Sequence, residues 1–476
     1  MRQRLLIFML AFSFTLTVVA ERKEVHILSA NDMHAAITAF PQLADIADSL
    51  RALYPGLLVL SAGDNRTGDP LNDMYEIPAY PMVALMNQVG FDATALGNHE
   101  FDSRANGLAK LIDLSNFSYL CANISAEASL GIHTIPYKVF DVNGVKVGVI
   151  GIVQLGTHGI PDTHPANLTG ISFIPPVEAA AQYEWLSQQC DVTILLSHNG
   201  YEEDVASTSI LTWLDLIIGG HSHYQIDGGE MHNSILVTQN VNRLKNVTHI
   251  TIVVDDGKVV DKRAETISVR NHTGKNKVVA ELVNFFSNNP SFERVLTQVA
   301  TPFNTYEELG YMMCDAFVAE ADAEVAIENA GGVRYDKHDV GPFTVNDVLM
   351  LDPFGNDAVE LQLSAEELRV MLMSCYNNDS KTFPYVSGVQ CKVFFDKNDT
   401  TVLKDLQLLT PDGKKLNKKK LYKVVTSSYV ASICDSPRKD QGQSINRTTA
   451  DLIISFLEKQ PSISYQGQKR ITFATK

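Results

Sequence analysis

The chain has 476 residues, of which 45% are hydrophobic and 20% charged, and its formal net charge at pH 7 is −16. This length allows two or three domains and a sizeable hydrophobic core. The negative charge disfavours general binding to nucleic acid or to an anionic membrane, so an anionic small molecule would have to be attracted by local positive groups.

The first twenty residues predict a signal peptide. Arg2 and Arg4 precede a run without charged residues, from Leu5 to Ala20, and the small residues before Glu21 suit a cleavage site. The run is too short to favour a membrane span, and no later segment is apolar enough for one, so we expect no stable membrane insertion. We expect residues 1–20 to direct secretion to the periplasm or the cell exterior. Their removal takes away two arginines and brings the net charge to −18.

Five short apolar runs predict buried strands, because each is rich in β-branched residues or leucine and gives way to a loop. They cover residues 25–29, 57–61, 93–96, 192–196 and 214–218. Each run is followed by residues that can bind a divalent metal. The five motifs are Asn31-Asp32-Met33-His34, Gly63-Asp64-Asn65, Gly97-Asn98-His99-Glu100, Ser197-His198-Asn199 and Gly220-His221-Ser222-His223.

We expect these motifs to meet in one groove, because ligands of open α/β sheets bind at the carboxyl ends of the strands. Oxygen and imidazole ligands without thiolate suit Zn, Mn or Fe in a site that performs chemistry, whereas structural zinc usually prefers cysteine. Any one motif alone is more often a turn or a surface histidine than a metal site. The prediction of a metal site therefore rests on the ordered set.

Apolar residues at helical spacing predict helices over residues 41–54, 78–89, 103–114 and 175–189. Hairpins are predicted over residues 137–153, around Asn143-Gly144, and over residues 249–269, around Asp256-Gly257. A layered α/β sandwich over residues 21–269 follows from this alternation of strands and helices.

Residues 270–290 begin polar and then show apolar residues at helical spacing, which predicts a linker helix. Residues 291–476 form the predicted second domain, in which helices over 309–320 and 365–377 are mixed with several strands. A lysine-rich segment after Pro411-Asp412-Gly413 predicts a solvated hairpin.

Six cysteines are spread over the chain without the spacing of a metal site. An oxidising compartment would permit disulfides, and Cys375 and Cys391 are the nearest plausible pair within one predicted domain. Buried free thiols are an equally good interpretation, since connectivity does not follow from spacing.

The order of the motifs resembles the calcineurin-like metallophosphoesterases, specifically the secreted 5'-nucleotidase family. The resemblance runs from Asp32 through Asn329-Ala330-Gly331-Gly332-Val333-Arg334 to Asp352-Pro353-Phe354-Gly355-Asn356. It implies an α/β fold with a four-layer α/β/β/α metallophosphoesterase sandwich and a second, smaller α+β domain that determines substrate specificity. It also implies two divalent metals. One would be held by Asp32, His34, Asp64 and His223, and the other by Asp64, Asn98, His198 and His221, with Asp64 as the bridge.

Two metals about 3.5 to 4 Å apart can lower the pKa of a shared water and neutralise phosphoryl oxygens. The leaving group then needs an acid, and His99 is the natural candidate because of its place beside Asn98. The resemblance implies that Asp102 orients His99. A simpler interpretation, compatible with that role, is that Asp102 caps the helix that starts near Ser103. Glu100 receives no role.

By resemblance, Asn329, Arg334, Phe354 and Asn356 contact a nucleotide, with Phe354 stacking on the base. Tyr429 is the candidate for the second face of an aromatic clamp. Other interpretations remain open for three of them: a simple turn at Asn329, a core position for Phe354, and a strand position for Tyr429.

The sequence departs from the family pattern at two places. After Tyr429 the family usually has a glycine-rich turn of the type Asn-Gly-Gly-Asp-Gly, whereas this chain reads Ala431-Ser432-Ile433-Cys434-Asp435-Ser436-Pro437. The family commonly has an arginine for phosphate before Gly310, and this chain has none there. Phosphate recognition is therefore expected to rest on Arg334 and the metals.

The segment Asn65-Arg66-Thr67 is a glycosylation sequon directly after Asp64. A glycan there would obstruct the proposed site, which favours a bacterial setting without such glycosylation.

The leading functional prediction is a secreted two-metal phosphohydrolase that releases phosphate from nucleotides, with nucleoside 5'-monophosphates favoured. The alternatives are a nucleotide diphosphosugar hydrolase, a 2',3'-cyclic nucleotide phosphodiesterase and a thiosulfohydrolase. An alternative of another class is a secreted protein that binds nucleotides without turnover. In each nucleotide case the partner is a small molecule and not a nucleic acid.

Overall fold

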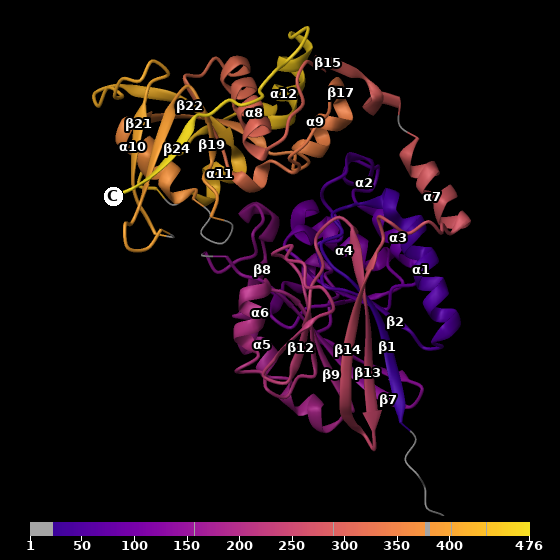
Figure 1. Ribbon diagram of the computed structural model, residues 1–476. Helices are drawn as coiled ribbons and strands as arrows, with labels where there is room; N and C mark the ends of the chain where they lie inside the picture. Colours follow the sequence, from indigo (N-terminus) through magenta and orange to yellow (C-terminus); the bar gives the residue numbers. More distant parts are fainter. Residues whose placement is uncertain (1–21, 157, 289, 377–380, 401, 435) are drawn as a thin grey trace, which may run out of the picture.

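The structure is a computed structural model that describes residues 22–156, 158–288, 290–376, 381–400, 402–434 and 436–476. The predicted signal peptide lies outside the described residues. Two domains follow one another along the chain (Figure 1), the N-terminal one coloured indigo to magenta and the C-terminal one orange to yellow. Within the described residues, no helix combines the length and the apolar character that a membrane crossing requires.

The N-terminal domain contains two six-stranded sheets. The first has the order β14-β13-β1-β2-β3-β4, in which β1 to β4 run parallel and β13 and β14 form the predicted hairpin. Its strands are β1 (Lys23–Ala30), β2 (Leu58–Ser61), β3 (Ala93–Ala95), β4 (Ser118–Leu120), β13 (Asn246–Asp255) and β14 (Lys258–Ser268).

The second sheet has the order β11-β12-β10-β9-β7-β6. Strands β7, β9, β10 and β12 are parallel, and β6 and β7 form the other predicted hairpin. Its strands are β6 (Tyr137–Val142), β7 (Val145–Val153), β9 (Val192–His198), β10 (Leu216–Gly219), β11 (Glu230–His232) and β12 (Ile235–Thr238). All five strands predicted from the apolar runs are confirmed.

The two sheets pack face to face, with Ile27 and Leu60 of the first against Ile194 and Ile218 of the second. Apolar residues on the outer face of the first sheet pack against α1 (Phe40–Leu53), α3 (Tyr80–Val89) and α4 (Arg104–Leu114). On the outer face of the second sheet lie α5 (Pro176–Ala181) and α6 (Tyr201–Ser207). The predicted α/β/β/α sandwich is confirmed. Smaller elements are α2 (Pro70–Asp73), β5 (Ile124–Ala126) and β8 (Ile171–Phe173).

The helix predicted over residues 175–189 is interrupted. After Ala181 the backbone changes to the shorter three-residue hydrogen bonds, such as that from the Leu186 amide to the Tyr183 carbonyl, and a 3₁₀ turn follows over Glu184–Gln188. The tighter turn places Leu186, which is 1% exposed, in the outer core of the second sheet.

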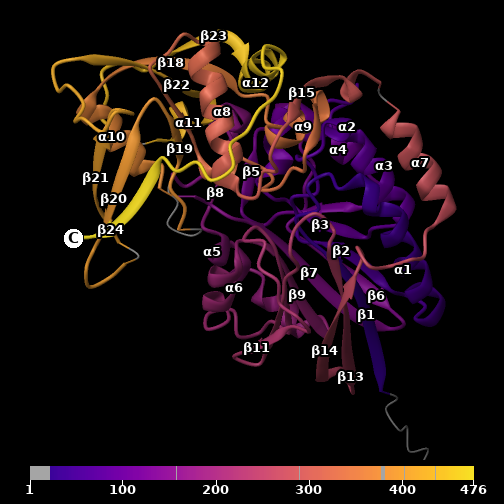
Figure 2. The same ribbon diagram turned by 45° about the horizontal axis from the view of Figure 1, so that its top comes forward.

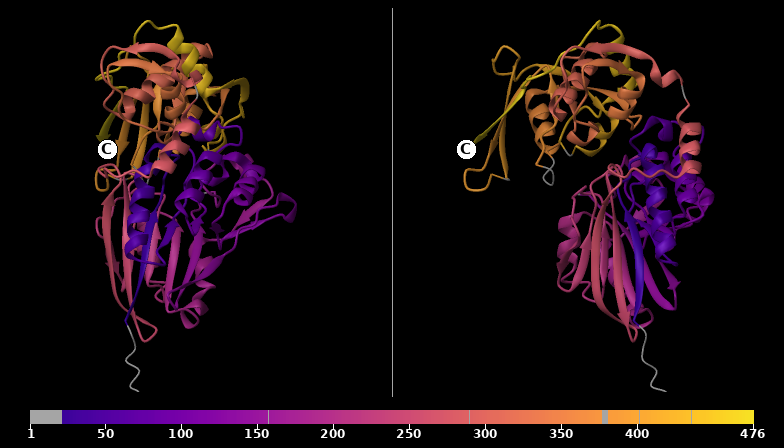
Figure 3. Two further views of the ribbon diagram at one scale, coloured as in Figure 1. Left: turned by 90° about the vertical axis from the view of Figure 1, so that its right-hand side faces the viewer. Right: turned by 45° about the vertical axis from the view of Figure 1, so that its right-hand side comes forward.

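The predicted linker helix is α7 (Lys277–Ser287), which starts where the Asn276 side chain accepts a hydrogen bond from the Val279 amide. Its apolar face, with Val279, Val283 and Phe286, is buried in the core that also holds α1 and α3. Figure 3 shows α7 lying against these helices. The linker helix is therefore packed as part of the N-terminal domain.

The C-terminal domain has a five-stranded sheet of order β19-β16-β22-β18-β23, a three-stranded sheet of order β21-β20-β24 and the pair β15-β17. Figure 2 shows the three-stranded sheet on the far side of the domain from α12. The strands are β15 (Val295–Val299), β16 (Val325–Glu328), β17 (Gly341–Thr344), β18 (Asp357–Ser364), β19 (Tyr385–Ser387), β20 (Gln390–Phe395), β21 (Leu403–Leu409), β22 (Leu421–Ser427), β23 (Gln443–Thr448) and β24 (Ile471–Thr475).

Two hydrophobic cores cover the faces of the five-stranded sheet, one containing residues of α8, α9 and α12 and the other residues of α10 and α11. The helices are α8 (Tyr306–Glu320), α9 (Val345–Leu351), α10 (Ala365–Ser374), α11 (Ser428–Ile433) and α12 (Thr449–Glu458). Helix α8 begins before the predicted residue 309 because Thr305 caps it by accepting from the Glu308 amide. The predicted end of α10 at residue 377 lies outside the described residues.

A disulfide joins Cys375 to Cys434. The predicted pair of Cys375 and Cys391 is wrong, because Cys391 lies on β20 with a side chain buried in the core. Cys375 and Cys434 instead stand at the C-terminal ends of α10 and α11, with their Cα atoms 5.8 Å apart.

Candidate active site

The five motifs follow β1, β2 and β3 of the first sheet and β9 and β10 of the second. The structure brings all seven predicted metal ligands together at these strand ends. Three overlapping groups have ligand atoms within 4.8 Å of one another. The groups are Asp32, His34 and His223; His34, Asp64 and His99; and Asp64, His198 and His221.

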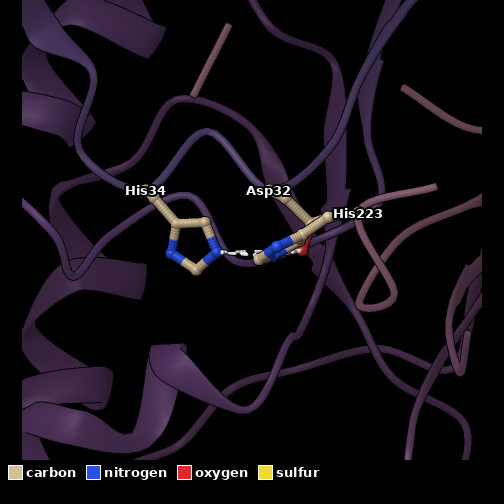
Figure 4. A group of neighbouring side chains, drawn as sticks. All are labelled: Asp32, His34 and His223. Carbon is tan, nitrogen blue, oxygen red and sulfur yellow. Dashed lines mark hydrogen bonds and ion pairs between the residues drawn. The ribbon is translucent and has the colours of Figure 1, made fainter. Parts of the chain in front are cut away.

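The first group pairs a carboxylate with two imidazoles (Figure 4). His223 Nε2 lies 3.4 Å from Asp32 Oδ1 and 3.0 Å from His34 Nε2. The Nδ1 atom of His34 is 3.0 Å from the Thr67 carbonyl, which can only accept a hydrogen bond. Nδ1 therefore carries the proton in the neutral ring, and the lone pair of Nε2 points toward His223 and Asp32.

The third group, with Asp64, His198 and His221, surrounds the side-chain oxygen of Asn98. His198 Nε2 lies 3.2 Å from Asp64 Oδ2 and 3.3 Å from Asn98 Oδ1, and His221 Nδ1 is 3.1 Å from the same Asn98 oxygen. The amide nitrogen of Asn98 donates to the Asp162 carbonyl at 3.0 Å. This bond turns the Asn98 oxygen toward the two histidines.

The oxygens of Asp64 and Asn98 both face His198 Nε2, so a positive charge is needed between these acceptors. His198 Nδ1 donates to the Ala62 carbonyl at 2.7 Å, so a neutral His198 would turn its Nε2 lone pair toward the Asp64 and Asn98 oxygens. Burial opposes protonation of His198, but Asp64 and Asp32 outweigh it and raise its pKa to about 10. The proton on His198 Nε2 thus lies where a divalent metal would bind. The set of carboxylate, amide oxygen and imidazole donors fits such a metal.

Asp64 lies at the centre of the cluster. Burial alone would raise its pKa, but His198 and His99 hold the pKa well below the usual aspartate value. Asp64 is therefore ionised, and its Oδ2 atom lies 3.9 Å from His34 Nε2 as well as 3.2 Å from His198 Nε2. One carboxylate oxygen thus faces a histidine of the first group and a histidine of the third.

The backbone around the site adopts conformations that are uncommon for residues other than glycine. Asp32, Asp64, His221 and His223 have φ angles of 47°, 51°, 74° and 55°. Such angles cost free energy and persist where the surrounding structure imposes them. Gly97 permits the close approach of two loops, since a Cβ atom there would lie 2.2 Å from Asp64 Oδ1.

His99 and Asp102 form a hydrogen-bonded pair, with Nδ1 2.7 Å from Oδ2. The Asp102 carboxylate also accepts from the hydroxyls of Thr67 at 2.7 Å and Thr163 at 2.9 Å. The helix-cap interpretation of Asp102 is wrong, because the N-cap of α4 is Ser103. Burial opposes protonation of His99, but Asp64 and Asp102 raise its pKa above the usual histidine value.

Glu100, which received no role from the sequence, binds three backbone amides with its buried carboxylate. It accepts from the amides of Asp64 and Asn65 at 2.9 Å each and from Gly97 at 2.6 Å. It therefore joins the loops after β2 and β3. No sequence signal distinguishes this function from that of an ordinary acidic residue, because the partners are main-chain groups.

Asn65 is 3% exposed, and its amide nitrogen donates to the Thr94 hydroxyl at 2.9 Å. There is no room for a glycan on this side chain. The sequon at Asn65 therefore gives no support to the expectation of a bacterial setting.

A cavity of about 680 Å³ lies between the two domains, with Asp64, Asn98, His99, His221 and His223 on one side. All five predicted substrate-binding residues line it from the other side, namely Asn329, Arg334, Phe354, Asn356 and Tyr429. Other lining residues were not predicted, because they belong to no recognisable motif. They include Asp162, Thr163, His164 and Asn167 of the N-terminal domain and Ser374, Cys375, Tyr376, Ile433 and Cys434 of the C-terminal domain.

Two side chains of the C-terminal domain reach histidines of the site. Arg334 Nη2 lies 3.2 Å from His34 Nδ1, and its guanidinium group is 5.4 Å from the centre of the Phe354 ring. Phe354 is half-buried and stacks on the imidazole of His99 at 5.9 Å between ring centres. The core interpretation of Phe354 is therefore wrong.

The remaining predicted contacts differ in their local setting. Asn329 begins a 3₁₀ turn, with its amide oriented to donate to Glu328 Oε1 at 2.7 Å, so the turn interpretation holds alongside its place in the cavity. Asn356 Oδ1 accepts from the Ser428 hydroxyl at 3.2 Å. Tyr429 lies on α11, so its assignment to a strand is wrong.

Comparison with known proteins gives two family matches. Residues 25–225 match the calcineurin-like phosphoesterase family, and residues 289–437 match the 5'-nucleotidase C-terminal domain. Protein UshA of Yersinia enterocolitica is 26% identical over 90% of this chain and 88% of that protein. A 5'-nucleotidase of Vibrio parahaemolyticus is also 26% identical, over 88% of this chain and 84% of that protein.

Among solved structures, the 5'-nucleotidase precursor from Thermus thermophilus superimposes with a TM-score of 0.83 at 23% identity, covering 95% of this chain and 99% of that one. This likeness supports the two-domain fold. The two family matches lie one after the other and together include every strand-end motif and the segment from Asn329 to Asn356. The chain therefore belongs to the 5'-nucleotidase family of metal-dependent phosphoric ester hydrolases, in which a calcineurin-like phosphoesterase domain precedes a 5'-nucleotidase C-terminal domain.

Proposed function

We propose that the protein is a two-metal phosphohydrolase that releases phosphate from nucleotides and prefers nucleoside 5'-monophosphates. The observation that carries the proposal is the position of Asp64, whose carboxylate oxygen faces both His34 and His198 next to the pair of His99 and Asp102. Residues 21–269 would form the catalytic domain, 270–290 the linker, and 291–476 the substrate-binding domain.

In this proposal, one divalent metal is held by Asp32, His34, Asp64 and His223, and the other by Asp64, Asn98, His198 and His221. The candidates are Zn, Mn and Fe, which accept oxygen and imidazole ligands. When bound, the metals supply an activated water and neutralise charge on the phosphoryl oxygens. The Thr67 and Ala62 carbonyls orient His34 and His198, and Glu100 holds the two loops that carry Asp64 and Asn98.

His99 would give a proton from Nε2 to the departing alkoxide oxygen. The hydrogen bond from Nδ1 to Asp102 fixes the ring and stabilises its protonated form, so the proton available for transfer is on the side of the cluster. The raised pKa of His99 agrees with this role, because the protonated acid is then present near neutral pH.

The C-terminal domain would recognise the rest of the nucleotide. Arg334 lies beside His34 and would meet the phosphate, where its planar guanidinium can make paired hydrogen bonds. Phe354 and Tyr429 offer aromatic faces to a base, and Asn329 and Asn356 offer amide groups to polar atoms of the nucleoside. The relatives named 5'-nucleotidases support a nucleotide as the substrate.

We also propose secretion through residues 1–20 to the periplasm or the cell exterior. The pattern of Arg2, Arg4 and the following apolar run supports a signal peptide, and the disulfide between Cys375 and Cys434 suits an oxidising compartment.

The test is elemental analysis of the purified protein combined with phosphate release from a panel of substrates. We expect about two divalent metal ions per chain, loss of activity with a chelator, and recovery when metal is added back. Nucleoside 5'-monophosphates should give the highest kcat/KM. Preference for a nucleotide diphosphosugar or a 2',3'-cyclic nucleotide would replace the substrate assignment, and tight nucleotide binding without turnover would leave only a binding protein.

A further inference from the structure

The disulfide between Cys375 and Cys434 lies in the wall of the cavity. Both cysteines line it, together with Ser374 and Tyr376 on one side of the bond and Ile433 on the other. The bond joins the C-terminal ends of α10 and α11, which are 59 residues apart in the sequence. This wall is the region where the sequence departs from the glycine-rich turn expected by resemblance.

The C-terminal end of α11 is also held by side chains. Arg438 donates to the carbonyl groups of Ala431 and of Cys434, the latter at 3.1 Å. His158 of the N-terminal domain has Nε2 3.1 Å from the Ile433 carbonyl, which can only accept. The end of α11 is therefore fixed by a covalent bond, by a cation and by a contact from the other domain.

The opposite end of α11 carries a proposed substrate contact. Tyr429 is the second residue of this short helix, and the preceding Ser428 donates to Asn356 at 3.2 Å. Because α11 spans only Ser428–Ile433, a displacement of its C-terminal end would be transmitted to Tyr429 over less than two helical turns. The position of Cys434 thus bears on where Tyr429 stands in the cavity, and through Ser428 on the side chain of Asn356.

We propose that the Cys375–Cys434 disulfide is a positioning element for nucleotide binding, which holds α11 as the fixed wall against which the nucleoside end of the substrate is placed. This inference rests on the proposed function. It concerns only the part of the substrate beyond the phosphate, because the proposed metal ligands, His99 and Asp102 belong to the N-terminal domain, and Arg334, the proposed phosphate contact, belongs to neither α10 nor α11. The disulfide therefore affects which phosphate ester is bound and not the chemistry at phosphorus.

The test compares the full-length, metal-loaded protein with the double variant Cys375→Ser/Cys434→Ser on two substrates. One is a nucleoside 5'-monophosphate and the other is p-nitrophenyl phosphate, which lacks a nucleoside. We expect KM for the nucleotide to rise about tenfold or more, since a small misplacement of binding groups has effects of this size. With p-nitrophenyl phosphate, kcat/KM should change less than about twofold, and the metal content should be unchanged. The matched control is Cys190→Ser, at a partly buried free cysteine of the N-terminal domain, which should leave both substrates unaffected.

A folded double variant with unchanged KM for the nucleotide overturns the inference, and so does an equal loss on both substrates. If the double variant does not fold, the folded wild type is treated with a water-soluble phosphine. The phosphine becomes a phosphine oxide with oxygen from water, and the disulfide becomes two thiols. The same rise in KM, reversed by reoxidation, is then expected, and no rise overturns the inference.

Failure of the proposed function is recognised separately. If the metal-loaded wild type hydrolyses neither ester, the phosphohydrolase assignment fails. Calorimetric titration of wild type and variant with the nucleotide still decides the inference, because the disulfide should then alter Kd alone by about the same factor.

Discussion

The Phe354 ring of the C-terminal domain stacks on the imidazole of His99 in the N-terminal domain, with 5.9 Å between ring centres and 23° between planes. An aromatic side chain from one domain thus covers the proposed acid of the other. The contact joins the expected place of the base or sugar to the place where the leaving group departs.

Replacement of Phe354 by alanine should therefore affect nucleotides more than simple esters. We expect kcat/KM for a nucleoside monophosphate to fall about tenfold, which corresponds to loss of one aromatic contact of about 1 to 1.5 kcal/mol. Turnover of p-nitrophenyl phosphate should be retained. Phe354→Tyr is the matched control, since it keeps the ring, and an equal loss for both variants would contradict the stacking role.

His99→Ala should lower kcat for a nucleotide by about 10² to 10⁴-fold while the metal content is retained. The ribose oxygen is a poor leaving group that needs a proton, whereas p-nitrophenolate leaves without one. The loss should therefore be much smaller with p-nitrophenyl phosphate. Asp102→Asn should show the same selectivity to a lesser degree, and a uniform loss on both substrates would argue against a leaving-group acid.

Asp64→Asn should remove metal from both sites, because Asp64 is the only residue placed in both proposed ligand sets. We expect the metal content per chain, measured by elemental analysis, to fall by more than the one equivalent that loss of a single site would cause. The rate should fall by three orders of magnitude or more, in line with several kcal/mol of charge stabilisation. Asp113→Asn, at an exposed carboxylate of the same domain, is the control. Retention of full metal content in Asp64→Asn would disprove the bridging role.

Glu100→Ala should weaken metal binding without removing a ligand. Three backbone amides from two loops lose their acceptor, and the position of Asp64 is no longer fixed. We expect metal affinity to drop about 10 to 100-fold in a competition titration with a chelating dye. Glu265→Gln, at an exposed position, should bind metal like the wild type. Unchanged metal affinity of a folded Glu100→Ala variant would show that the loops after β2 and β3 keep their positions without Glu100.

Asp69 provides a test of stability against pH. Burial raises its pKa to about 6, although it accepts a hydrogen bond from the Leu71 amide as the N-cap of α2. A carboxyl group whose pKa is raised on folding stabilises the folded state below the unfolded pKa, and this contribution is lost as the pH rises from about 4 to about 6.

Asp69→Asn keeps a good N-cap and removes the ionisable group. Relative to the wild type, its free energy of unfolding should therefore increase by up to about 3 kcal/mol between pH 4 and pH 7. The thermal unfolding midpoints of the two proteins, measured in parallel across this range, give the difference. Parallel curves for the two proteins would contradict the raised pKa.

The strands and the proposed metal cluster could be predicted because each apolar run and the metal-binding residues after it lie together in the sequence. Runs such as Val192–His198 pass from β-branched residues to a histidine, and the parallel order of strands places such endings together. The linker helix was visible in the spacing of Val279, Val283 and Phe286, but its burial against α1 was not, because packing partners are set by tertiary structure.

Features that depend on distant main-chain groups could not be predicted. The role of Glu100 arises from amides of Asp64 and Asn65, which are brought near it only by the folded loops. Likewise, Cys434 meets Cys375 because α10 and α11 end side by side, and spacing along the sequence favoured Cys391. The break in the helix after Ala181 allows Leu186 to be buried. It could not be predicted, because the same apolar spacing also fits an uninterrupted helix.

The proposed metal ligands come from the ends of both six-stranded sheets. In the proposed assignment, each ion takes at least one ligand from each of the two sheets. Each ion therefore cross-links the two sheets at one end of the sandwich. Cations that bind only the folded chain add to its stability in proportion to the logarithm of their concentration. A cell short of metal would then lose enzyme molecules to unfolding and proteolysis, in addition to losing turnover from those that survive.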